Sequence, residues 1–399
     1  MLKVCVLGLG YVGLPVALNI SSKFKTIGFD ISLKRIRELK NKFDHNKEFK
    51  KINFIKKKIK FSNNKQDLAD PNIYIICVPT PVKKDKLPDL SHIKNSISII
   101  SKYIKVGDVI ILESTVYPGV TEKFTKFLEI KSGFKNNKDF YMCYSPERIN
   151  PGDNSKNLKN INKIFAVNSN NKKVISRVKK VYKLISKELI FTKNISEAET
   201  AKAIENTQRD LNIALFNEIL ILSKKINLNF NEIIKLASTK WNFVKFKPGL
   251  VGGHCLPVDP YYLSYIAKKN KFRTNTLLSG RSTNNNMKNY VISEILKCIK
   301  KNRLKNKAKI LVLGISYKYG VSDLRNSLGL EIFNSIKKKY KNTYFYDPFV
   351  NIKNKLTNIK KLKNFELIIF LSSGKKYKPI FKQSFKNNLL ILDPFNYFS

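Results

Sequence analysis

Apolar residues lie along the chain in short runs, and each run ends in a turn of glycine, proline or polar residues. The first run, residues 2–7, leads into GLGYVG at 8–13, and a segment with helical spacing follows it. Short apolar runs bounded by turns indicate buried strands, and strands that alternate with helical segments predict a parallel sheet. We therefore expect a doubly wound α/β domain. The pattern recurs at residues 72–81, 108–119, 140–152, 164–169 and 187–193.

A single long helix is predicted over residues 195–226, because this stretch has no glycine or proline and is apolar around much of its circumference. We expect Ser196 to be its N-cap, with Glu199 completing a capping box. Around residue 304 the strand, turn and helix pattern begins again, and Asp347 ends one of the new strands. The sequence thus predicts two Rossmann-like doubly wound domains joined by a central helical domain, with boundaries 1–193, 194–303 and 304–399.

The first turn has the glycine spacing of a dinucleotide site. Gly8, Gly10 and Gly13 lie between a predicted strand and a predicted helix, and Asp30 ends the second strand 17 residues after the last glycine. Such glycines let a pyrophosphate approach the helix N-terminus, and the acid accepts hydrogen bonds from the adenosine ribose. The acid favours NAD over NADP. The alternative is an ordinary glycine-rich turn.

Polar side chains follow several strands of the first domain. Thr80, Thr115, Glu147 and Arg148 each come directly after an apolar run. Ligands of doubly wound sheets bind at the carboxyl ends of the strands, so we expect these four residues to face one crevice. Turn chemistry is the competing interpretation, because threonine and proline also end strands.

Residues 246–263, FKPGLVGGHCLPVDPYYL, combine glycines with one thiol and one carboxylate. Gly252 stands three residues before Cys255, and Asp259 stands four residues after it. Glycine lets the backbone approach a ligand closely, and the prolines restrict the loop. We interpret this stretch as a rigid loop that presents one sulfur. A small buried cysteine without a chemical role is the alternative.

The long helix carries Lys202, Asn206 and Arg209 on one face, since they are spaced by four and three residues. A solvent-exposed surface is the other explanation of this face. An NAD site combined with a thiol indicates aldehyde oxidation through a thiohemiacetal and a thioester. Lys202 and Asn206 could then stabilise an oxyanion, or Lys202 and Asp259 could transfer protons, and the spacing does not choose between these roles.

The second doubly wound domain lacks a complete glycine motif, because Gly314 is not followed by two more spaced glycines. We therefore expect no second dinucleotide there. Lys318 and Arg325, seven residues apart, suit phosphate groups. They could equally be two of many basic surface residues.

The amino-acid composition restricts which other classes of protein and site the chain can belong to. Five cysteines are scattered without a CxxC spacing and there are three histidines, so neither a disulfide framework nor a metal site is expected. No apolar run approaches the length of a membrane span and no cleavage site is visible, so we expect a cytoplasmic protein. The formal net charge of +47 makes a nucleic-acid-binding protein the alternative from another class. We discount it, because lysines are spread over the chain without arginine clusters or aromatic platforms.

The chain resembles the nucleotide-sugar 6-dehydrogenases along almost its whole length. The resemblance rests on GLGYVGLP, VPTP, ESTVYPG, YSPERINPG, EAETAKAIENTQRDLNIALFNEI, PGLVGGHCLPVDPYYL and YKYGVSDLRNS, in the order of the family. It implies two successive oxidations of a sugar's primary alcohol to a carboxylate by two NAD, an NAD domain, a helical dimerisation domain and a UDP-binding domain. It also implies a homodimer formed through the long helix.

Site residues follow from the resemblance by position. The implied catalytic residues are Cys255 as nucleophile, Asp259, Lys202 with Asn206 as its oxyanion partner, and Thr115 and Glu147 for water and protons. The implied NAD contacts are Gly8, Gly10, Tyr11, Val12, Gly13, Asp30, Arg35, Thr80, Thr115 and Arg325. The implied substrate contacts are Arg148, Ile149, Lys202, Asn206, Arg209, Gly252 and Lys318.

The pairing of ENTQRDLNIALFNE with STKWNF resembles the branch that acts on UDP-N-acetylglucosamine or UDP-N-acetylgalactosamine. Departures from that branch are the LPVDP segment and the lysine-rich stretch from Phe43 to Phe61. UDP-glucose or UDP-N-acetylmannosamine is the alternative substrate, and a one-step hydroxyacid dehydrogenase, which needs no thiol, is a more distant rival. The expected product is a uronic acid for surface polysaccharide.

Overall fold

The structure is a computed structural model that describes residues 1–46, 49–55, 57–148, 158–356 and 359–398. It divides into two compact units. Unit 1 comprises residues 1–205 and 261–272, and unit 2 comprises residues 206–260 and 273–399. One boundary falls inside the long helix α6, Ile195–Lys225, and another falls inside α8, Asp259–Lys269.

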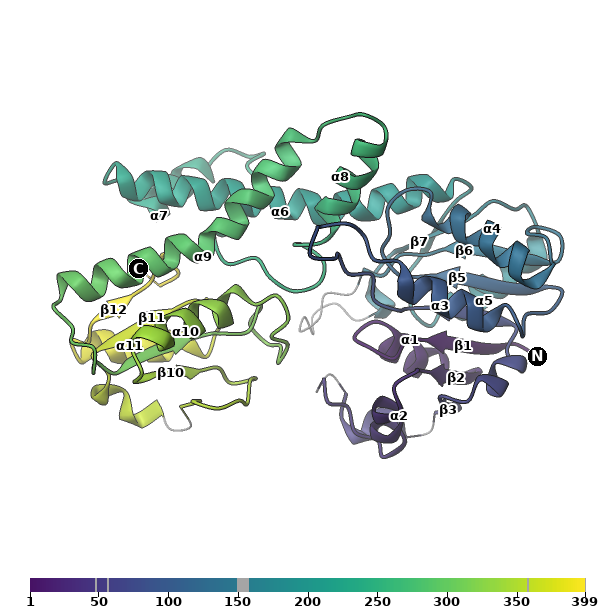
Figure 1. The fold of residues 1–399 in the computed structure, drawn as a ribbon, viewed down its shortest axis with the longest axis horizontal. Helices are drawn as coiled ribbons and strands as arrows, with labels where there is room; N and C mark the ends of the chain where they lie inside the picture. Colours follow the sequence, from purple (N-terminus) through teal and green to yellow (C-terminus); the bar gives the residue numbers. More distant parts are fainter. Residues whose placement is uncertain (47–48, 56, 149–157, 357–358, 399) are drawn as a thin grey trace. The chain divides into compact units, whose positions relative to one another are not determined.

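Unit 1 contains an eight-stranded sheet with the order β3-β2-β1-β4-β5-β6-β7-β8 (Figure 1). All neighbouring strands are parallel except β6 and β7, which pair antiparallel through Cys143 and Val167. The predicted doubly wound sheet is thus confirmed, with one antiparallel pair that the apolar pattern did not indicate. The strands are β1 (Lys3–Leu7), β2 (Lys25–Phe29), β3 (Ile59–Ser62), β4 (Ile73–Ile76), β5 (Asp108–Leu112), β6 (Phe140–Tyr144), β7 (Lys163–Val167) and β8 (Leu189–Thr192).

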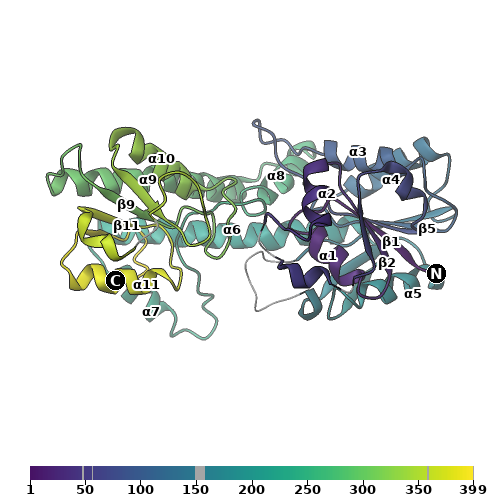
Figure 2. The ribbon, with the colours of Figure 1, turned by 90° about the horizontal axis from the view of Figure 1, so that it is seen from below.

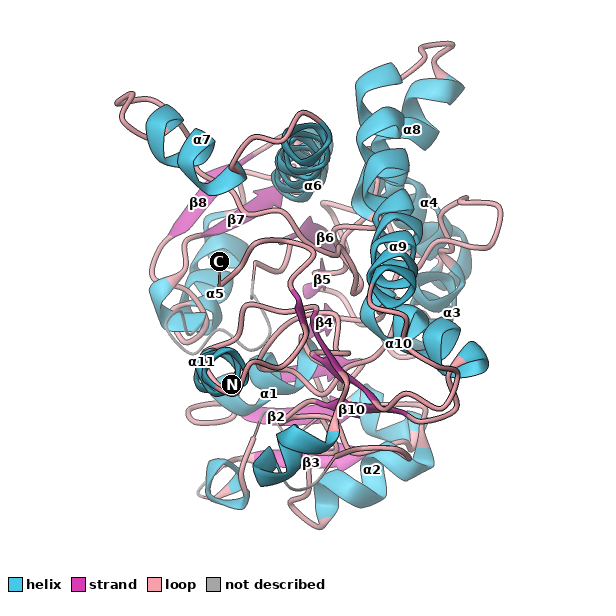
Figure 3. Ribbon diagram, turned by 90° about the vertical axis from the view of Figure 1, so that its left-hand side faces the viewer, coloured by secondary structure: helices cyan, strands magenta, loops and turns pink. Residues whose placement is uncertain are grey.

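Helices cover both faces of this sheet. Apolar residues of α1, α2 and α5 form one core with Val4, Val6 and Ile75 of the strands, while α3 and α4 pack together on the opposite face (Figure 3). Every residue of β4, β5 and β6 is buried, which explains why these strands are apolar apart from Asp108 at the start of β5. The helices are α1 (Gly13–Ile20), α2 (Leu33–Lys40), α3 (Ser91–Ile100), α4 (Val120–Ser132) and α5 (Lys172–Tyr182), with short 3-10 turns at Lys51–Phe54, Lys65–Ala69 and Leu158–Asn160.

The predicted capping box of the long helix is wrong. Helix α6 begins one residue before Ser196, and the side chain of Asn194 accepts a hydrogen bond from the amide of Glu197 at 3.2 Å. Glu199 instead turns to the start of α4, where it accepts hydrogen bonds from Gly119 N and from both the amide and the hydroxyl of Thr121. The carboxylate therefore satisfies amides of another helix, which local spacing does not reveal.

Unit 2 contains a four-stranded parallel sheet with the order β10-β9-β11-β12 (Figure 2). Successive residues of β9 face opposite sides: Ile310 and Val312 pack with α9 and α10, whereas Leu311 and Leu313 pack with α11. Leu220 of α6 belongs to the first of these cores. The elements are α7 (Phe230–Ala237), α9 (Asn275–Lys301), β9 (Ile310–Leu313), α10 (Leu328–Lys339), β10 (Thr343–Tyr346), a 3-10 turn (Ile359–Asn364), β11 (Leu367–Phe370), α11 (Tyr377–Lys386) and β12 (Ile391–Leu392).

Among the described residues, no helix combines the length and the apolar character that crossing a membrane requires.

Candidate active site

Each of the three positions of the first turn holds glycine for a different structural reason. Gly8 has φ of +86°, which disfavours any other residue. A Cβ atom on Gly13 would lie 1.8 Å from the carbonyl oxygen of Gly8, so this glycine permits the close contact of turn and helix. Gly10 has open space, because a Cβ there would meet no atom within 4 Å. The fold therefore requires the first and third glycines but not the second.

Open space at Gly10 fits the passage of a pyrophosphate close to the backbone at the start of α1. Asp30 supports the same turn, because its carboxylate accepts the amide of Leu9 at 2.8 Å. Arg35 is buried beneath the turn, donates from Nε to Leu9 O at 2.9 Å and pairs with Asp44 at 2.9 Å. The turn, its acid and its arginine thus form one assembly that fits a dinucleotide.

Two predicted residues meet at the carboxyl ends of β4 and β5. The hydroxyl of Thr80 donates to the carbonyl oxygen of Thr115 at 2.7 Å. Ser114, beside Thr115, donates to Val78 O at 2.6 Å. The hydroxyl of Tyr262 in turn donates to the carbonyl oxygen of Thr80. These bonds hold the two strand ends together at the edge where a ligand is expected.

Glu147, Arg148 and Lys202 also lie together in unit 1. Arg148 bonds Asn162 O at 3.1 Å and forms an ion pair with Glu205 of α6. Lys202 is buried, and its ammonium lies 4.0 Å from the other carboxylate oxygen of Glu205. Glu205 therefore connects a predicted substrate residue to a predicted catalytic residue, a role that the sequence analysis missed.

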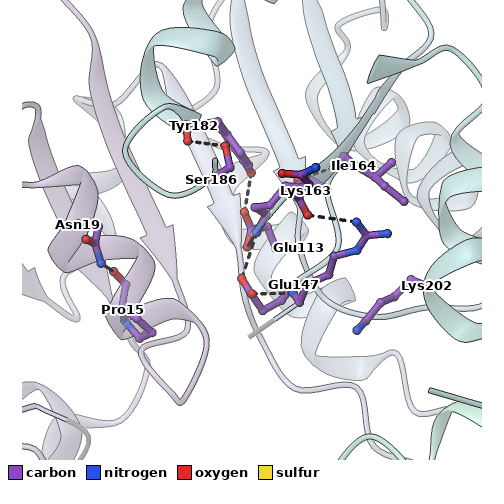
Figure 4. Close-up of polar contacts among 12 residues, drawn as sticks. Pro15, Asn19, Glu113, Glu147, Lys163, Ile164, Tyr182, Ser186 and Lys202 are labelled. Atoms are coloured by element: carbon purple, nitrogen blue, oxygen red, sulfur yellow. Dashed lines mark hydrogen bonds and ion pairs between the residues drawn. The ribbon is translucent and has the colours of Figure 1, made fainter. Parts of the chain in front are cut away.

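A buried charged cluster lies behind Glu147 (Figure 4). The ammonium of Lys163 is 3.0 Å from Glu147 Oε2 and 3.0 Å from Glu113 Oε2. The hydroxyl of Tyr182 donates to Glu113 Oε1 at 2.6 Å. Burial raises the pKa of Glu113 to about 7, with the charge of Glu147 acting in the same direction and that of Lys163 against it. The two carboxylates raise the pKa of Lys163 against the effect of burial, so it is a cation at all ordinary pH values.

Unit 2 carries the cysteine loop. Cys255 is exposed, while the glycines before it are held tightly. A Cβ on Gly252 would lie 2.5 Å from Asn326 O, and one on Gly253 would lie 2.7 Å from the ring of Tyr317. Gly253 has φ of +87°, and its carbonyl oxygen accepts from Asn326 at 2.9 Å. The predicted rigid loop is therefore fixed by the segment that follows β9.

The base of the loop is fixed by α6. Asn217, fully buried, bonds both the amide and the carbonyl of Gly249, at 2.8 and 3.1 Å. Beyond the sulfur, the amide of Asp259 donates to Cys255 O at 2.9 Å and closes the turn into α8. The carboxylate of Asp259 is buried and accepts from the side-chain amide of Asn206 at 2.5 Å. Cys255, Asp259 and Asn206 are thus brought together within unit 2.

A cavity of about 350 Å³ opens beside this loop, at the carboxyl ends of β9 and β11. Both Gly252 and Lys318 line this cavity. Two residues that contact the same substrate must lie near each other, so their shared position is compatible with the substrate role predicted for both. Gly314 has φ of +84°, and a Cβ on Gly329 would lie 3.1 Å from Gly314 O, which repeats the relationship of Gly13 to Gly8. The turn between Gly314 and Gly329 is longer than the corresponding turn of unit 1. The other residues that line the cavity include Ser316, Tyr317, Tyr319 and Ser372.

Arg325 lies on the same turn, exposed and bound to Asp323 through Nε at 3.0 Å and Nη2 at 2.8 Å. His254 Nε2 lies 3.0 Å from Oδ2 of Asp323, the oxygen that Arg325 Nη2 also contacts. Hydrogen bonds from His254 and Arg325 hold the pKa of Asp323 well below its usual range, although burial opposes them. Asp323 therefore links Arg325 to the residue next to Cys255, which no motif indicated.

The remaining predicted contacts are placed as follows. Tyr11 is half-buried in the glycine turn and Val12 is the N-cap residue of α1. Arg209 is exposed on α6. Ile149 lies outside the described residues.

Sequence reasoning missed Glu113, Lys163, Tyr182 and Glu205. Glu113 follows β5 directly and precedes Ser114 and Thr115, so its position just after a strand was a usable signal. Lys163 opens a strand of otherwise apolar residues, but a single lysine is inconspicuous among 76 basic residues. Tyr182 closes α5 with no motif around it.

Three consecutive models of one family match the chain. They are the NAD binding domain of the UDP-glucose/GDP-mannose dehydrogenase family over residues 2–186, its central domain over residues 196–286, and its UDP binding domain over residues 311–399. The glycine turn and Asp30 lie in the first, the cysteine loop lies in the second, and the turn with Lys318 lies in the third. NAD is therefore the cofactor, in agreement with the fit of the turn around Gly10.

Individual relatives agree with these models. The chain is 40% identical to the protein CapL of Staphylococcus aureus, over 94% of this chain and 90% of that protein. It is 40% identical to UDP-N-acetyl-D-glucosamine 6-dehydrogenase of Pseudomonas aeruginosa, over 88% and 83% of the two chains. A solved structure of UDP-D-ManNAc dehydrogenase from Pyrococcus horikoshii has a TM-score of 0.89, at 32% identity and with coverage of 100% and 96%. The chain therefore belongs to the UDP-glucose/GDP-mannose dehydrogenase family and is an NAD-dependent UDP-sugar dehydrogenase.

Proposed function

We propose that the protein oxidises the primary alcohol of a UDP-N-acetylhexosamine twice, giving the UDP-uronic acid. The observation that carries this proposal is the exposed thiol of Cys255 on a loop held by Asn217, Tyr317 and Asn326. A one-step alcohol dehydrogenase has no use for such a nucleophile, whereas a thiol can form the thiohemiacetal through which an aldehyde is oxidised to an acid.

The proposed reaction has four steps. The alcohol first loses a proton and a hydride to give the aldehyde. The thiolate of Cys255 adds to the aldehyde carbon, and the oxygen takes up a proton to give a thiohemiacetal. This intermediate loses that proton and a second hydride to give a thioester, which water hydrolyses to the acid and the free thiol. NAD, when bound, accepts one hydride in each oxidation, so two NADH form for each sugar.

We assign Lys202 and Asn206 to the oxygen that becomes negative during addition and hydrolysis. An amide group has two N–H donors, and Asp259 accepts only one of those of Asn206. Glu147 and Thr115 are proposed to position water and to assist the proton transfers. Asp259 is assigned to orient Asn206 and the thiol, since its own amide bonds Cys255 O.

The remaining assignments concern binding. For NAD we propose Gly8, Gly10, Gly13, Asp30 and Thr80, with Tyr11, Val12, Arg35, Thr115 and Arg325 as further contacts. For the UDP-sugar we propose Arg148, Ile149, Lys202, Asn206, Arg209, Gly252 and Lys318. The cavity that Gly252 and Lys318 share supports a UDP site there, and Ser316 and Tyr317 add polar groups to its lining.

UDP-N-acetylglucosamine and UDP-N-acetylgalactosamine are the substrates that we favour from the motifs, and UDP-N-acetylmannosamine is an equal candidate. Relatives support both N-acetyl sugars, since a 40% identical protein carries the first name and a 32% identical structure carries the mannosamine name. UDP-glucose remains the alternative outside the N-acetyl sugars.

A substrate panel tests the proposal. NADH formation is followed with the four UDP-sugars named above, and the products are separated by anion exchange. We expect a uronic acid from at least one N-acetyl sugar, with UDP-glucose slower. Cys255→Ala should abolish acid formation, whereas Cys298→Ala, at a half-buried cysteine of α9, is the matched control. Acid formation by Cys255→Ala at the wild-type rate contradicts the proposal.

We also propose that the enzyme is a homodimer that associates through α6. Leu215, Leu222 and Ile226 are each about half exposed, and their spacing of seven and four residues puts them on one face of the helix. Trp241 is 92% exposed shortly after α7. An exposed apolar stripe of this kind favours a protein partner over water. Light scattering should give twice the chain mass of 46.1 kDa, and Leu215→Glu with Leu222→Glu should give the single chain.

The cytoplasm is the proposed location. The five cysteines all lie among the described residues and form no disulfide, which suits a reducing compartment. Supply of a uronic acid to surface polysaccharide is the proposed role of the product.

A further inference from the structure

Behind Glu147 lies a group of ionisable side chains that the proposed mechanism does not use. They come from separate elements: Glu113 follows β5, Lys163 opens β7 and Tyr182 ends α5 (Figure 4). Lys163 and Glu113 are 1% exposed and Tyr182 is fully buried. Burying charges is costly even when they are paired, because the loss of hydration can exceed the attraction between them, so stability alone does not explain this arrangement.

The geometry connects this group directly to Glu147. One carboxylate oxygen of Glu147 accepts from the amide of Arg148 at 2.6 Å, and the other accepts from Lys163 at 3.0 Å. The amide of Glu147 also donates to Glu113 O at 3.3 Å. Both oxygens and the backbone of Glu147 are therefore positioned by named partners.

The charges are unequal, because two carboxylates share one ammonium in a buried space. The described groups that face Lys163 are Glu113, Glu147, the ring of Tyr182 at 5.7 Å and the thiol of Cys77. Burial raises the pKa of Cys77 and of Tyr182, so both are neutral at ordinary pH. Of the two carboxylates, Glu113 is the deeper one, with a pKa of about 7, and it holds a proton more readily as the pH falls. The ammonium then acts on Glu147 alone.

We propose that Lys163 is a positioning residue of the reaction: it orients the carboxyl group of Glu147 and places a positive charge beside it, while Glu113, held by Tyr182, shares the same ammonium. This inference rests on the proposed role of Glu147 in the proton transfers. An adjacent cation favours the ionised form of a carboxyl group, and an adjacent carboxylate disfavours it.

The two partners of Lys163 therefore affect the pH profile differently. Glu113 is already protonated below its pKa of about 7, so Glu113→Gln should leave the acidic limb of the kcat–pH profile nearly where it is in the wild type. Lys163→Met in the Glu113→Gln background removes the cation from Glu147 without leaving a second unpaired carboxylate. Its acidic limb should move to higher pH, by about one to three units. Lys163→Arg keeps the charge and should restore most of the wild-type profile.

The experiment measures kcat against pH with saturating NAD and, in separate series, with UDP-N-acetylglucosamine and UDP-N-acetylmannosamine. Lys180→Met, an exposed lysine of α5, controls for the loss of one positive charge. NADH binding, followed by its fluorescence, reports that the domain of each variant is folded. A shift of the acidic limb in the double variant that is absent from Glu113→Gln supports the proposal, because a purely structural defect lowers activity without moving the limb.

An unshifted acidic limb in the double variant overturns the proposal, whatever the loss of rate. Should the double variant fail to fold, Lys163→Gln in the Glu113→Gln background, which places a polar neutral side chain at the same position, decides, and an unchanged limb there is again the contrary result. Glu147→Gln distinguishes a wrong role of Lys163 from a wrong role of Glu147 in the proton transfers. If Glu147→Gln makes acid with the wild-type profile, the role of Glu147 fails and the inference fails with it. If Glu147→Gln is inactive but no limb moves, only the role of Lys163 is wrong.

Discussion

The side-chain amide of Asn206 donates to the buried carboxylate of Asp259 at 2.5 Å, so one residue of the proposed oxyanion site is oriented by the acid that follows the nucleophile. Asn206→Ala should lower kcat about 100-fold through loss of a donor to the oxyanion. It should also lower the free energy of unfolding by about 1–3 kcal/mol, because Asp259 loses a donor. Steady-state kinetics and urea unfolding measure both effects.

Asn212→Ala is the matched control, since the side-chain amide of Asn212 makes an exposed hydrogen bond to the Gln208 carbonyl one turn earlier on the same helix. Asn212→Ala should change kcat and the free energy of unfolding little. Equal losses in the two variants would contradict the assigned role of Asn206.

Two glycines of the NAD turn should respond differently to one added methyl group. Gly10→Ala should leave the melting temperature nearly unchanged, because its Cβ meets no atom within 4 Å, but should weaken NADH binding at least tenfold through contact with the pyrophosphate. A tenfold weaker affinity corresponds to a loss of about 1.4 kcal/mol of binding free energy. Unweakened binding by a folded Gly10→Ala protein would exclude this turn as the cofactor site.

Gly13→Ala should destabilise the fold itself. Its Cβ would lie 1.8 Å from Gly8 O, so the helix or the turn must shift, at a cost of about 1–3 kcal/mol or more. Thermal unfolding of this variant beside Gly10→Ala measures the contrast. Equal melting temperatures for the two variants would show that the turn does not pack as described.

Glu199 should be important for stability although it lies outside the proposed chemistry. It is fully buried and accepts three hydrogen bonds at the start of α4, two from Thr121 and one from Gly119. Glu199→Ala should lower the free energy of unfolding by about 1–3 kcal/mol, because buried amides lose their acceptor. Glu122→Ala, at the exposed Glu122–Lys126 pair of α4, should cost under about 1 kcal/mol. A reversed order in urea unfolding would be the contrary outcome.

The raised pKa of Glu113 predicts how stability depends on pH. The unfolded carboxyl has a pKa of about 4.3 and the folded one about 7, so the folded state binds the proton more tightly. The contribution of Glu113 is full below the unfolded pKa and is lost as the pH rises through about 7, by roughly 4 kcal/mol at most. The difference in unfolding free energy between wild type and Glu113→Gln should follow this decrease. A difference that is constant from pH 4.5 to 7.5 would contradict it.

Much of the fold follows from local patterns, because strand runs such as IYII at β4 are buried on all residues and need no long-range information. The antiparallel pairing of β6 with β7 could not be read in this way, since an apolar run does not state its direction. The capping error has the same origin. Ser196 and Glu199 have the spacing of a local cap, yet Glu199 bonds Thr121, which is 78 residues away in the chain.

The site shows the same division. Residues within motifs, such as Cys255 and Asp259, could be selected from sequence because glycine and proline spacing marks their loop. Glu113 and Lys163 could not be paired, because they are 50 residues apart and meet only where β5 and β7 lie on either side of β6. Asp323 likewise contacts His254, which is 69 residues away in the chain, and Arg325, which is two residues away.

The stoichiometry of the reaction tests the central claim most directly. Limiting UDP-N-acetylglucosamine or UDP-N-acetylmannosamine is converted to completion with excess NAD, and NADH and uronic acid are both counted. Oxidation of the alcohol through the Cys255 thioester predicts two NADH for each acid formed. One NADH for each sugar consumed, with an aldehyde or ketone as the final product, would contradict the account.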